Sequence, residues 1–303
     1  MQGTNKAKLR KYETLQGYLF IAPWLIGFLL FTMAPMFASL YMAFTRYDIL
    51  SSPQWIGFGN FKEMFTRDVR YWSAWKATLT FVFVAVPIRL LFALGVAMLL
   101  NTKLRMLSLF RATFYMPTLI GGSVAVAIMW RQLFGSNGAF NSVLSSLFGV
   151  SEKVSWITHP STAMWSLILL AVWQFGSAML IFLAGLKQVP TSLYEAADID
   201  GAGWWRKFHK ITLPLLSPVL FFNLIMGIIN GFKVFTEGLI VTNGGPFDKT
   251  LFYVLYVYEK SFRYYEMGYG SAMAWVLLLT TAVFTLIIFT TSRSWVFYES
   301  GRK

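Results

Sequence analysis

Residues 195–214 read EAADIDGAGWWRKFHKITLP, a charged stretch that separates two long apolar segments of the chain. The chain just before it has helix chemistry, because Thr191 or Ser192 can cap a helix and Glu195 would lie near the positive end of the helix dipole. Gly201 permits a sharp turn. Three large apolar side chains then stand among basic ones: Trp204, Trp205 and Phe208. The stretch is longer than a connector between two membrane-crossing helices needs.

The three aromatic residues of this stretch have two ordinary explanations. Aromatic side chains on a short helix beside a membrane can lie in the lipid headgroup region. Large exposed aromatic groups can equally fill a groove on another protein. The sequence therefore indicates an interface, either with membrane lipid or with a partner protein.

The composition of the 303-residue chain excludes most soluble classes of protein. Hydrophobic residues make up 56% of it and charged residues only 13%, whereas soluble proteins carry about a quarter charged residues. The net charge of +13 does not indicate nucleic-acid binding, because no basic face carries interleaved aromatic residues. The chain has no cysteine and two histidines, His159 and His209, so we expect no disulfide, no metal site and no histidine-based catalytic site.

Apolar runs long enough to cross a membrane predict the fold class, an all-α integral membrane protein with six transmembrane helices. The first run is far longer than the apolar core of a signal peptide, so we expect it to be retained. Prolines at 23, 35, 87 and 117 are expected to kink the helices. The expected spans are residues 18–44, 75–100, 109–133, 162–186, 215–235 and 270–291. They form a permease domain, 18–292, between tails at 1–17 and 293–303.

The distribution of lysine and arginine predicts the orientation of these spans. The two tails and the loops after the second and fourth spans hold about 14 of the 26 basic residues and about 5 acidic ones. The opposite loops hold about 11 basic and 8 acidic residues. Because basic residues accumulate on the cytoplasmic side, we expect both termini and residues 195–214 to be cytoplasmic.

The charged stretch carries a specific pattern, E-A-A, three residues, G, nine residues, I-x-L-P. It is met by Glu195, Ala196, Ala197, Gly201, Ile211, Leu213 and Pro214. This pattern resembles the cytoplasmic EAA loop of the membrane subunits of bacterial ABC importers, here residues 188–214. Three further segments, YLFIAPWLIGFLLFTMAP (18–35), GFGNF (57–61) and TNGGP (242–246), are similar to the MalF-type permeases of carbohydrate ABC importers. The larger maltose permease has additional spans and an external insertion that this chain lacks.

The resemblance implies a set of partners. A MalG-type permease would pair with this chain in a bacterial cytoplasmic membrane, two copies of an ABC ATPase would dock beneath, and an extracytoplasmic solute-binding protein would deliver a sugar. The chain has no Walker A sequence, so it is expected to be a transport subunit with no cofactor and no enzymatic activity. ATP and Mg would be bound by the ATPase. The residues expected to couple to it are Glu195, Ala196, Ala197, Gly201, Trp204, Trp205, Phe208 and Pro214.

The resemblance also implies a solute site within the spans that flank the EAA loop. Its positions correspond here to Trp173, Gln174, Ser177, Gly227, Asn230 and Gly231. Aromatic stacking together with amide hydrogen bonds would suit a sugar, although several side-chain types differ from those of the maltose permease. The alternative is that these residues serve helix packing and hydrogen bonding between helices, which is common in membrane bundles.

Arg89 is the clearest charge within a predicted span. It would either bind an anionic substrate, such as a phosphorylated or uronate sugar, or take a structural role at an interhelical carbonyl, a partner subunit or a lipid headgroup. The structural role is the favoured alternative.

The predicted function is that of the permease subunit of an ATP-driven sugar importer. Two alternatives remain open. One is an ABC permease for another solute, such as glycerol-3-phosphate or a polyamine. The other is a secondary carrier, which inverted repeats or intramembrane carboxylates would favour; the sequence displays neither.

Overall fold

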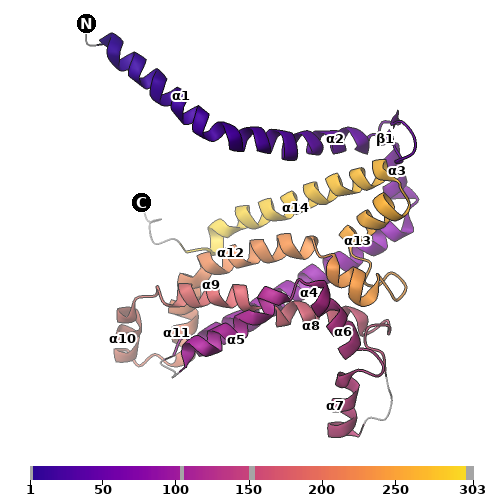
Figure 1. Ribbon diagram of the computed structural model, residues 1–303. Coiled ribbons are helices and arrows are strands. Elements are labelled where there is room, and N and C mark those ends of the chain that lie inside the picture. The colour runs from indigo at the N-terminus through magenta and orange to yellow at the C-terminus, as the bar shows by residue number, and fades with distance from the viewer. Residues whose placement is uncertain (1–2, 103–105, 150–153, 298–303) are drawn as a thin grey trace. The chain divides into compact units, whose positions relative to one another are not determined.

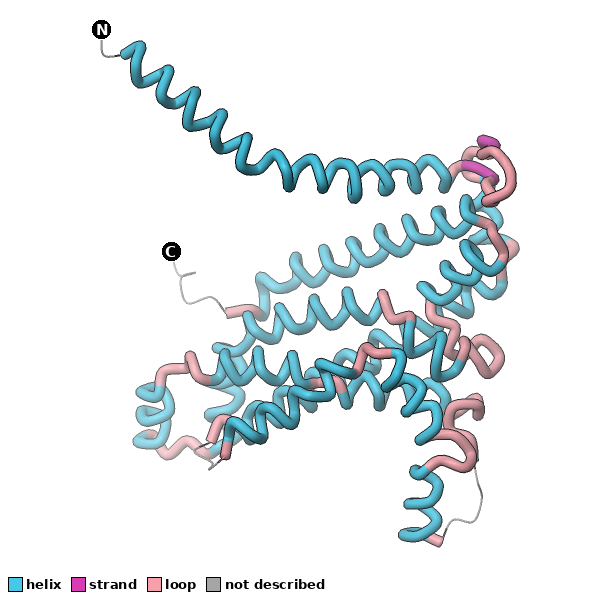
Figure 2. The backbone as a smooth tube through the Cα atoms, in the orientation of Figure 1, coloured by secondary structure: helices cyan, strands magenta, loops and turns pink. Residues whose placement is uncertain are grey.

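The computed structural model describes residues 3–102, 106–149 and 154–297. These residues are mainly helical (Figure 2). The strands among them are two short ones, β1 (Thr45–Arg46) and β2 (Gln54–Trp55). The expectation of an all-α protein is therefore confirmed, apart from this small hairpin.

The described residues divide into two compact units. Unit 1 comprises residues 3–66 and 260–275, and unit 2 comprises residues 67–259 and 276–297.

Unit 1 begins with a long helix. Three helical elements follow one another without a loop: α1 (Gly3–Phe28), the π-turn η1 (Leu29–Met33) and α2 (Ala34–Ala43). The π-turn comes just before Pro35, which has no N–H to donate to the preceding turn. The part that is apolar and long enough to cross a membrane is Gln16–Ala43, against a prediction of residues 18–44. Helix nevertheless begins at Gly3, within the expected tail.

A hairpin and a short helix follow α2 in unit 1. β1 and β2 pair antiparallel, and α3 (Gly59–Thr66) comes next. The side-chain amide of buried Asn60 donates to the carbonyls of Ala43, at 2.8 Å, and Thr45, at 2.9 Å. Gly57 has a φ of +57°, a left-handed conformation that favours glycine. The GFGNF pattern therefore has a local structural explanation. Its first glycine forms a turn, and its asparagine hydrogen-bonds the end of α2 and β1.

The second segment of unit 1 carries most of the π-turn η4 (Glu259–Arg263) and the first turns of α14 (Met267–Trp295). Trp275 of α14 donates through Nε1 to Ser39 Oγ of α2 at 3.2 Å. This contact ties the start of α14 to the first helix within unit 1.

α4 (Val69–Leu100) is the central helix of unit 2. Asp68 caps it, because its carboxylate accepts the N–H of Tyr71 at 3.1 Å. Several alanines on its buried face let neighbouring helices approach closely. It packs against three helices that run beside it (Figure 1): α8 (Ala163–Trp173), α9 (Gly176–Leu186) and α12 (Leu213–Phe232).

Two of the predicted spans are each divided at a bend. Within 109–133, α5 (Leu107–Ile120) and α6 (Val124–Leu133) meet at 99°, and within 162–186, α8 and α9 meet at 43°. Ser123 caps α6 after the Gly121–Gly122 pair. With each bent pair taken as one span, the described residues provide up to six crossings. The four unbroken candidates are Gln16–Ala43, Val69–Leu100, Trp204–Phe232 and Met267–Trp295.

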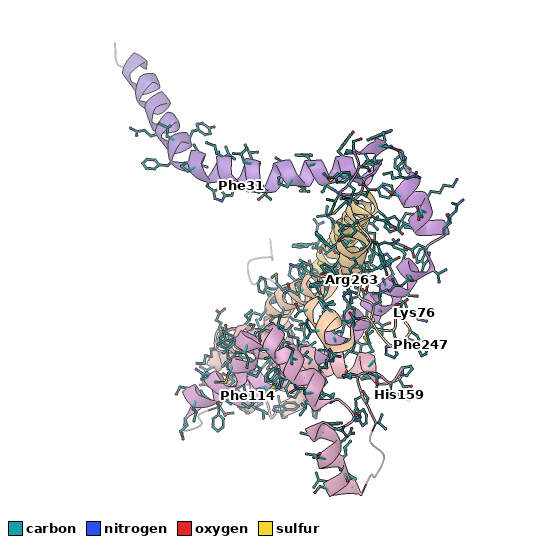
Figure 3. The ribbon with its side chains drawn as sticks, turned by 45° about the vertical axis from the view of Figure 1, so that its right-hand side comes forward. Phe31, Lys76, Phe114, His159, Phe247 and Arg263 are labelled. Carbon is teal, nitrogen blue, oxygen red and sulfur yellow. The ribbon has the colours of Figure 1, made fainter. Side chains whose placement is uncertain are left out.

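The remaining helices of unit 2 are short. They are α7 (Ala139–Phe148), α10 (Thr191–Ile199), α11 (Trp204–Lys207), the π-turns η2 (Phe208–Thr212) and η3 (Gly238–Thr242), and α13 (Tyr253–Tyr258). Within this unit, α10 and α11 lie at one end of the long helices (Figure 1). Phe247 and His159 lie at the opposite end (Figure 3).

An aromatic cluster joins α13 to α4 in the core of unit 2. The ring centroids of Trp75 and Tyr253 are 4.5 Å apart, and those of Tyr71 and Tyr253 are 5.8 Å apart. The N–H of Tyr253 donates to Oγ1 of the fully buried Thr78 at 2.8 Å. These contacts fix the chain that follows the TNGGP segment against the central helix.

Candidate functional site

The first helix of the EAA loop, α10, ends in a Schellman motif at Gly201. The N–H of Gly201 donates to the carbonyl of Asp198 at 3.1 Å, and the N–H of Ala202 donates to the carbonyl of Ala197 at 2.8 Å. Gly201 has a φ of +70°, which glycine adopts without the steric cost that other residues incur. The glycine of the EAA pattern is therefore required by the turn that closes α10.

The EAA loop exposes several large apolar side chains. Ile199 is 88% exposed, Trp204 59% and Trp205 67%. The ring of Trp204 stacks on that of Phe208 with centroids 5.6 Å apart, so the aromatic residues form one cluster. Glu195 and Ala196 are also exposed on α10. Of the coupling residues predicted from sequence, most therefore present themselves on the surface of this end of unit 2.

The EAA loop is tied firmly to the helix that follows it. The hydroxyls of Tyr194 and the buried Thr212 are 2.8 Å apart and hydrogen-bonded, and Lys207 forms an ion pair with Asp198. Pro214 lies in the first turn of α12, where a missing N–H costs little. Residues Trp204–Phe232 form one unbroken helical run, so a displacement of the EAA loop would be transmitted to α12.

Two adjoining cavities lie among the helices of unit 2. The larger has a volume of about 380 Å³ and the smaller of about 220 Å³. The larger is bounded by α4, α8, α12 and residues 233–237, and the smaller by α4, α9 and α12. The two share four lining residues: Val86, Arg89, Gly227 and Asn230.

Five of the six predicted solute-contact residues line these cavities. Gln174 and Gly231 line the larger, Ser177 lines the smaller, and Gly227 and Asn230 line both. A Cβ atom at Gly227 would come within 2.8 Å of Val86 Cγ1, and one at Gly231 within 3.0 Å of Val82 Cγ2. The two glycines therefore also allow α12 to pack closely against α4, as the alternative interpretation expects. Solute binding at these residues stays a prediction.

Trp173, the sixth predicted residue, lines neither cavity. Its ring is tilted against that of Trp130 on α6, with centroids 5.8 Å apart, and Trp130 Nε1 donates to the carbonyl of Ser166 at 3.0 Å. The aromatic rings that do line the larger cavity belong to Phe81 and Phe235.

Gln174 joins the two bent helix pairs. Its carbonyl lies at the break between α8 and α9, and it accepts hydrogen bonds from Arg89 Nη2 at 2.7 Å and Thr118 Oγ1 at 3.1 Å. Its side-chain amide donates to the carbonyl of Gly121 at 3.2 Å, at the break between α5 and α6. The expectation that Arg89 reaches an interhelical carbonyl is confirmed. Arg89 also lines both cavities, so the hydrogen bond to this carbonyl does not exclude a contact with a solute.

Glu237 is an acidic lining residue that was not predicted from sequence. It follows the predicted end of the fifth span by two residues, and it lines the larger cavity together with Lys233. Burial raises the pKa of the Glu237 carboxyl above its ordinary value, and the positive charge of Arg89 offsets this only in part. Among the described residues, no group of three or more His, Cys, Asp or Glu side chains is placed to hold a metal ion.

Residues 57–294 match the family described as the binding-protein-dependent transport system inner membrane component. The chain belongs to this family. It is accordingly a permease, a membrane-embedded transport subunit and not an enzyme.

Two relatives and one solved structure show how far the likeness extends. The permease is 52% identical to the probable ABC transporter permease YesP of Bacillus subtilis (strain 168), over 97% of this chain and 96% of that one. It is 37% identical to the arabinooligosaccharides transport permease AraP of the same strain, over 89% and 86% of the two chains. A chain of a bacterial transporter that imports the acidic polysaccharide alginate has the same fold, with a TM-score of 0.79, 24% identity and coverage of 95% and 98%.

Proposed function

We propose that the permease forms part of an ATP-driven importer of a sugar or oligosaccharide. Relatives of similar length are named for lactose and arabinooligosaccharide transport, and the cavities combine aromatic, amide and hydroxyl groups. Sugars are bound by such mixtures of apolar faces and a few directed polar groups. A MalG-type permease completes the pathway, and an extracytoplasmic solute-binding protein delivers the sugar. The proposed solute contacts are Gln174, Ser177, Gly227, Asn230 and Gly231, while Trp173 packs on Trp130 outside both cavities.

The observation that carries this proposal is the exposed aromatic cluster of the EAA loop. Trp204 and Trp205 stand outside the core on a segment that is continuous with α12. Exposed tryptophans in a rigid setting are typical anchors for a protein interface. In the proposed arrangement they enter a cleft of an ABC ATPase, which binds ATP and Mg. The EAA loop and both termini then lie on the cytoplasmic side of the membrane.

Movement of the EAA loop would be transmitted to the cavities through α12. ATP binding would close two ATPase copies and move the EAA loops, and α12 lines both cavities from the same helical run. The permease thereby alternates between states that open to opposite sides of the membrane.

A pull-down from mild detergent tests this proposal. The tagged permease should recover a second EAA-loop permease and a P-loop ATPase from its native host. Trp204→Ala combined with Trp205→Ala should insert into the membrane normally, yet recover little ATPase and support no ATP-dependent sugar uptake. Trp72→Ala, which removes an exposed tryptophan from the first turns of α4, is the control and should behave as wild type. Recovery of the chain alone, together with solute flux in liposomes that lack ATP, would contradict the importer proposal and indicate a secondary carrier.

A further inference from the structure

Arg89 is a cation between helices that forms no direct ion pair among the described residues, although the charge of Glu237 acts on it from a distance. Among the described residues, no carboxylate oxygen lies within 4.0 Å of its guanidinium. Within residues 3–102, 106–149 and 154–297, its one hydrogen bond runs from Nη2 to the neutral carbonyl of Gln174. Its Nε is buried and finds no acceptor among these residues. An unpaired buried charge is costly, so such groups are normally paired or hydrogen-bonded.

A second donor without an acceptor belongs to a residue that lines the smaller cavity beside Arg89. Asn223 is only 5% exposed, and its buried Nδ2 has no acceptor in the described part of the chain. Asn223 and Arg89 both line the smaller cavity, together with Ser177 and Asn230 and with no aspartate or glutamate. Buried polar groups in native structures are nearly always satisfied, and exceptions call for an explanation. Here two donors that lack acceptors belong to side chains that line one cavity, which indicates that the missing partner is an acceptor-rich ligand that these side chains reach.

The lining of the larger cavity also carries more positive than negative charge. Arg89 and Lys233 line it against a single acidic residue, Glu237. Asn230 and the shared wall at Val86 and Gly227 connect it with the smaller cavity. Together the two volumes, about 380 and 220 Å³, fall in the range of roughly 300–1,000 Å³ that small-molecule sites occupy.

We propose that the sugar carried by this permease bears an oxyanion, which binds between Arg89 Nε and Asn223 Nδ2. This inference rests on the proposed function and names its substrate class. Arginine presents a planar set of donors that matches a carboxylate or a phosphate. A uronate sugar and a sugar phosphate share this chemistry. The rest of the sugar then lies in the larger cavity, where Gln174 and Asn230 provide amide groups.

A purely structural role for Arg89 makes a different prediction. If the guanidinium served only to hold the Gln174 carbonyl at the helix break, its replacement would lower stability and would weaken the binding of charged and neutral sugars equally. Discrimination between a sugar acid and its neutral ester is therefore the decisive measurement.

The test measures sugar binding to the transporter complex purified without its solute-binding protein. Isothermal titration with three probes is compared: trigalacturonate, its fully methyl-esterified form, and glucose 6-phosphate. We expect trigalacturonate to bind at least about tenfold more tightly than its ester, the size of one charged hydrogen bond. Arg89→Gln and Asn223→Leu should each remove this preference. Arg89→Lys keeps the charge and loses the Nε donor, so it should restore the preference only in part.

Lys76→Gln is the matched control, because it removes an exposed cation from the same helix outside both cavities. It should keep the preference, and thermal unfolding of every variant reports whether the fold is intact. Binding of glucose 6-phosphate in place of trigalacturonate, with the same dependence on Arg89, supports the inference and identifies the oxyanion as phosphate. Equal affinity for acid and ester overturns this inference alone. An absence of ATP-dependent uptake for every sugar, measured in the native host with the solute-binding protein present, overturns the proposed function as well.

Discussion

The N–H of Ala202 donates to the carbonyl of Ala197 at 2.8 Å, across a glycine with a φ of +70°. This bond closes α10 and turns the chain toward the exposed tryptophans of the EAA loop. The shape of the proposed ATPase contact therefore depends on a backbone conformation that only glycine adopts at low cost.

Gly201→Ser should open this turn. A left-handed conformation costs a residue with a side chain roughly 1–2 kcal/mol, so we expect the amide of Ala202 to exchange its hydrogen about tenfold faster. ATP-dependent uptake should fall with it. Gly203→Ser is the matched control, since Gly203 has an ordinary φ of −66° at the N-cap of α11, where serine is favourable. Equal exchange rates in the two variants would contradict this explanation of the EAA glycine.

Gly176→Ala should destabilise the junction of the two bent helix pairs. A Cβ at Gly176 would lie 2.6 Å from the carbonyl oxygen of Phe114 and 2.7 Å from Thr118 Oγ1. Relief requires a backbone shift, and overpacking of this kind costs about 1–3 kcal/mol. Thermal unfolding in detergent, followed by tryptophan fluorescence, should show a lower midpoint. Gly95→Ala on α4, where the Cβ would meet nothing within 4 Å, should leave the midpoint unchanged or raise it.

Arg70→Lys should loosen the loop that carries Phe247. Arg70 donates from Nε and Nη2 to the two carboxylate oxygens of Asp248, each at 3.0 Å, and Asp248 itself has a φ of +56°. Lysine cannot make this paired contact, so the loss should be on the order of 1 kcal/mol. Hydrogen exchange over residues 243–250 should accelerate. Arg67→Lys, a conservative change of an exposed arginine nearby, should not alter this exchange rate. If the exchange rate is also unchanged in Arg70→Lys, the loop is ordered by its backbone contacts alone.

The helices were predictable from sequence because the thickness of the hydrocarbon core fixes their length. The EAA turn was predictable because its glycine, capping and proline chemistry is local. The breaks near Gly121 and Gln174 were not, since the Gln174 carbonyl is satisfied by Arg89, 85 residues earlier in the chain. Length and hydropathy contain no information on such a bond.

The lining of the larger cavity was predictable only in part, because it too depends on where the helices bend. Gln174 and Asn230 line it as the resemblance implies. The bend between α8 and α9 separates Gln174 from its neighbour Trp173, whose ring packs on Trp130. Glu237 was not predicted as a cavity residue because it lies just beyond the end of an apolar run, and sequence does not define a span boundary to within two residues.

Glu237 should make the uptake of an anionic sugar dependent on pH. Because burial raises the pKa of this carboxyl, its protonated form persists to a higher pH than that of an exposed glutamate. As pH falls, Glu237 therefore loses its negative charge before a sugar carboxylate with a pKa of roughly 3–4 does, and the sugar stays ionised. Uptake of trigalacturonate should therefore rise toward lower pH. A like charge in a partly desolvated cavity costs on the order of 1 kcal/mol, which corresponds to a change of a few-fold.

Glu237→Gln should flatten this pH profile at the level that wild type reaches at low pH, because the amide is neutral throughout. Glu63→Gln, which removes an exposed carboxylate from α3 outside both cavities, should retain the slope of wild type. Both histidines, His159 and His209, are present unchanged in all three proteins, so the difference between the profiles isolates Glu237. A rise in uptake with increasing pH, or identical slopes in wild type and Glu237→Gln, would show that this carboxyl does not act on the bound anion.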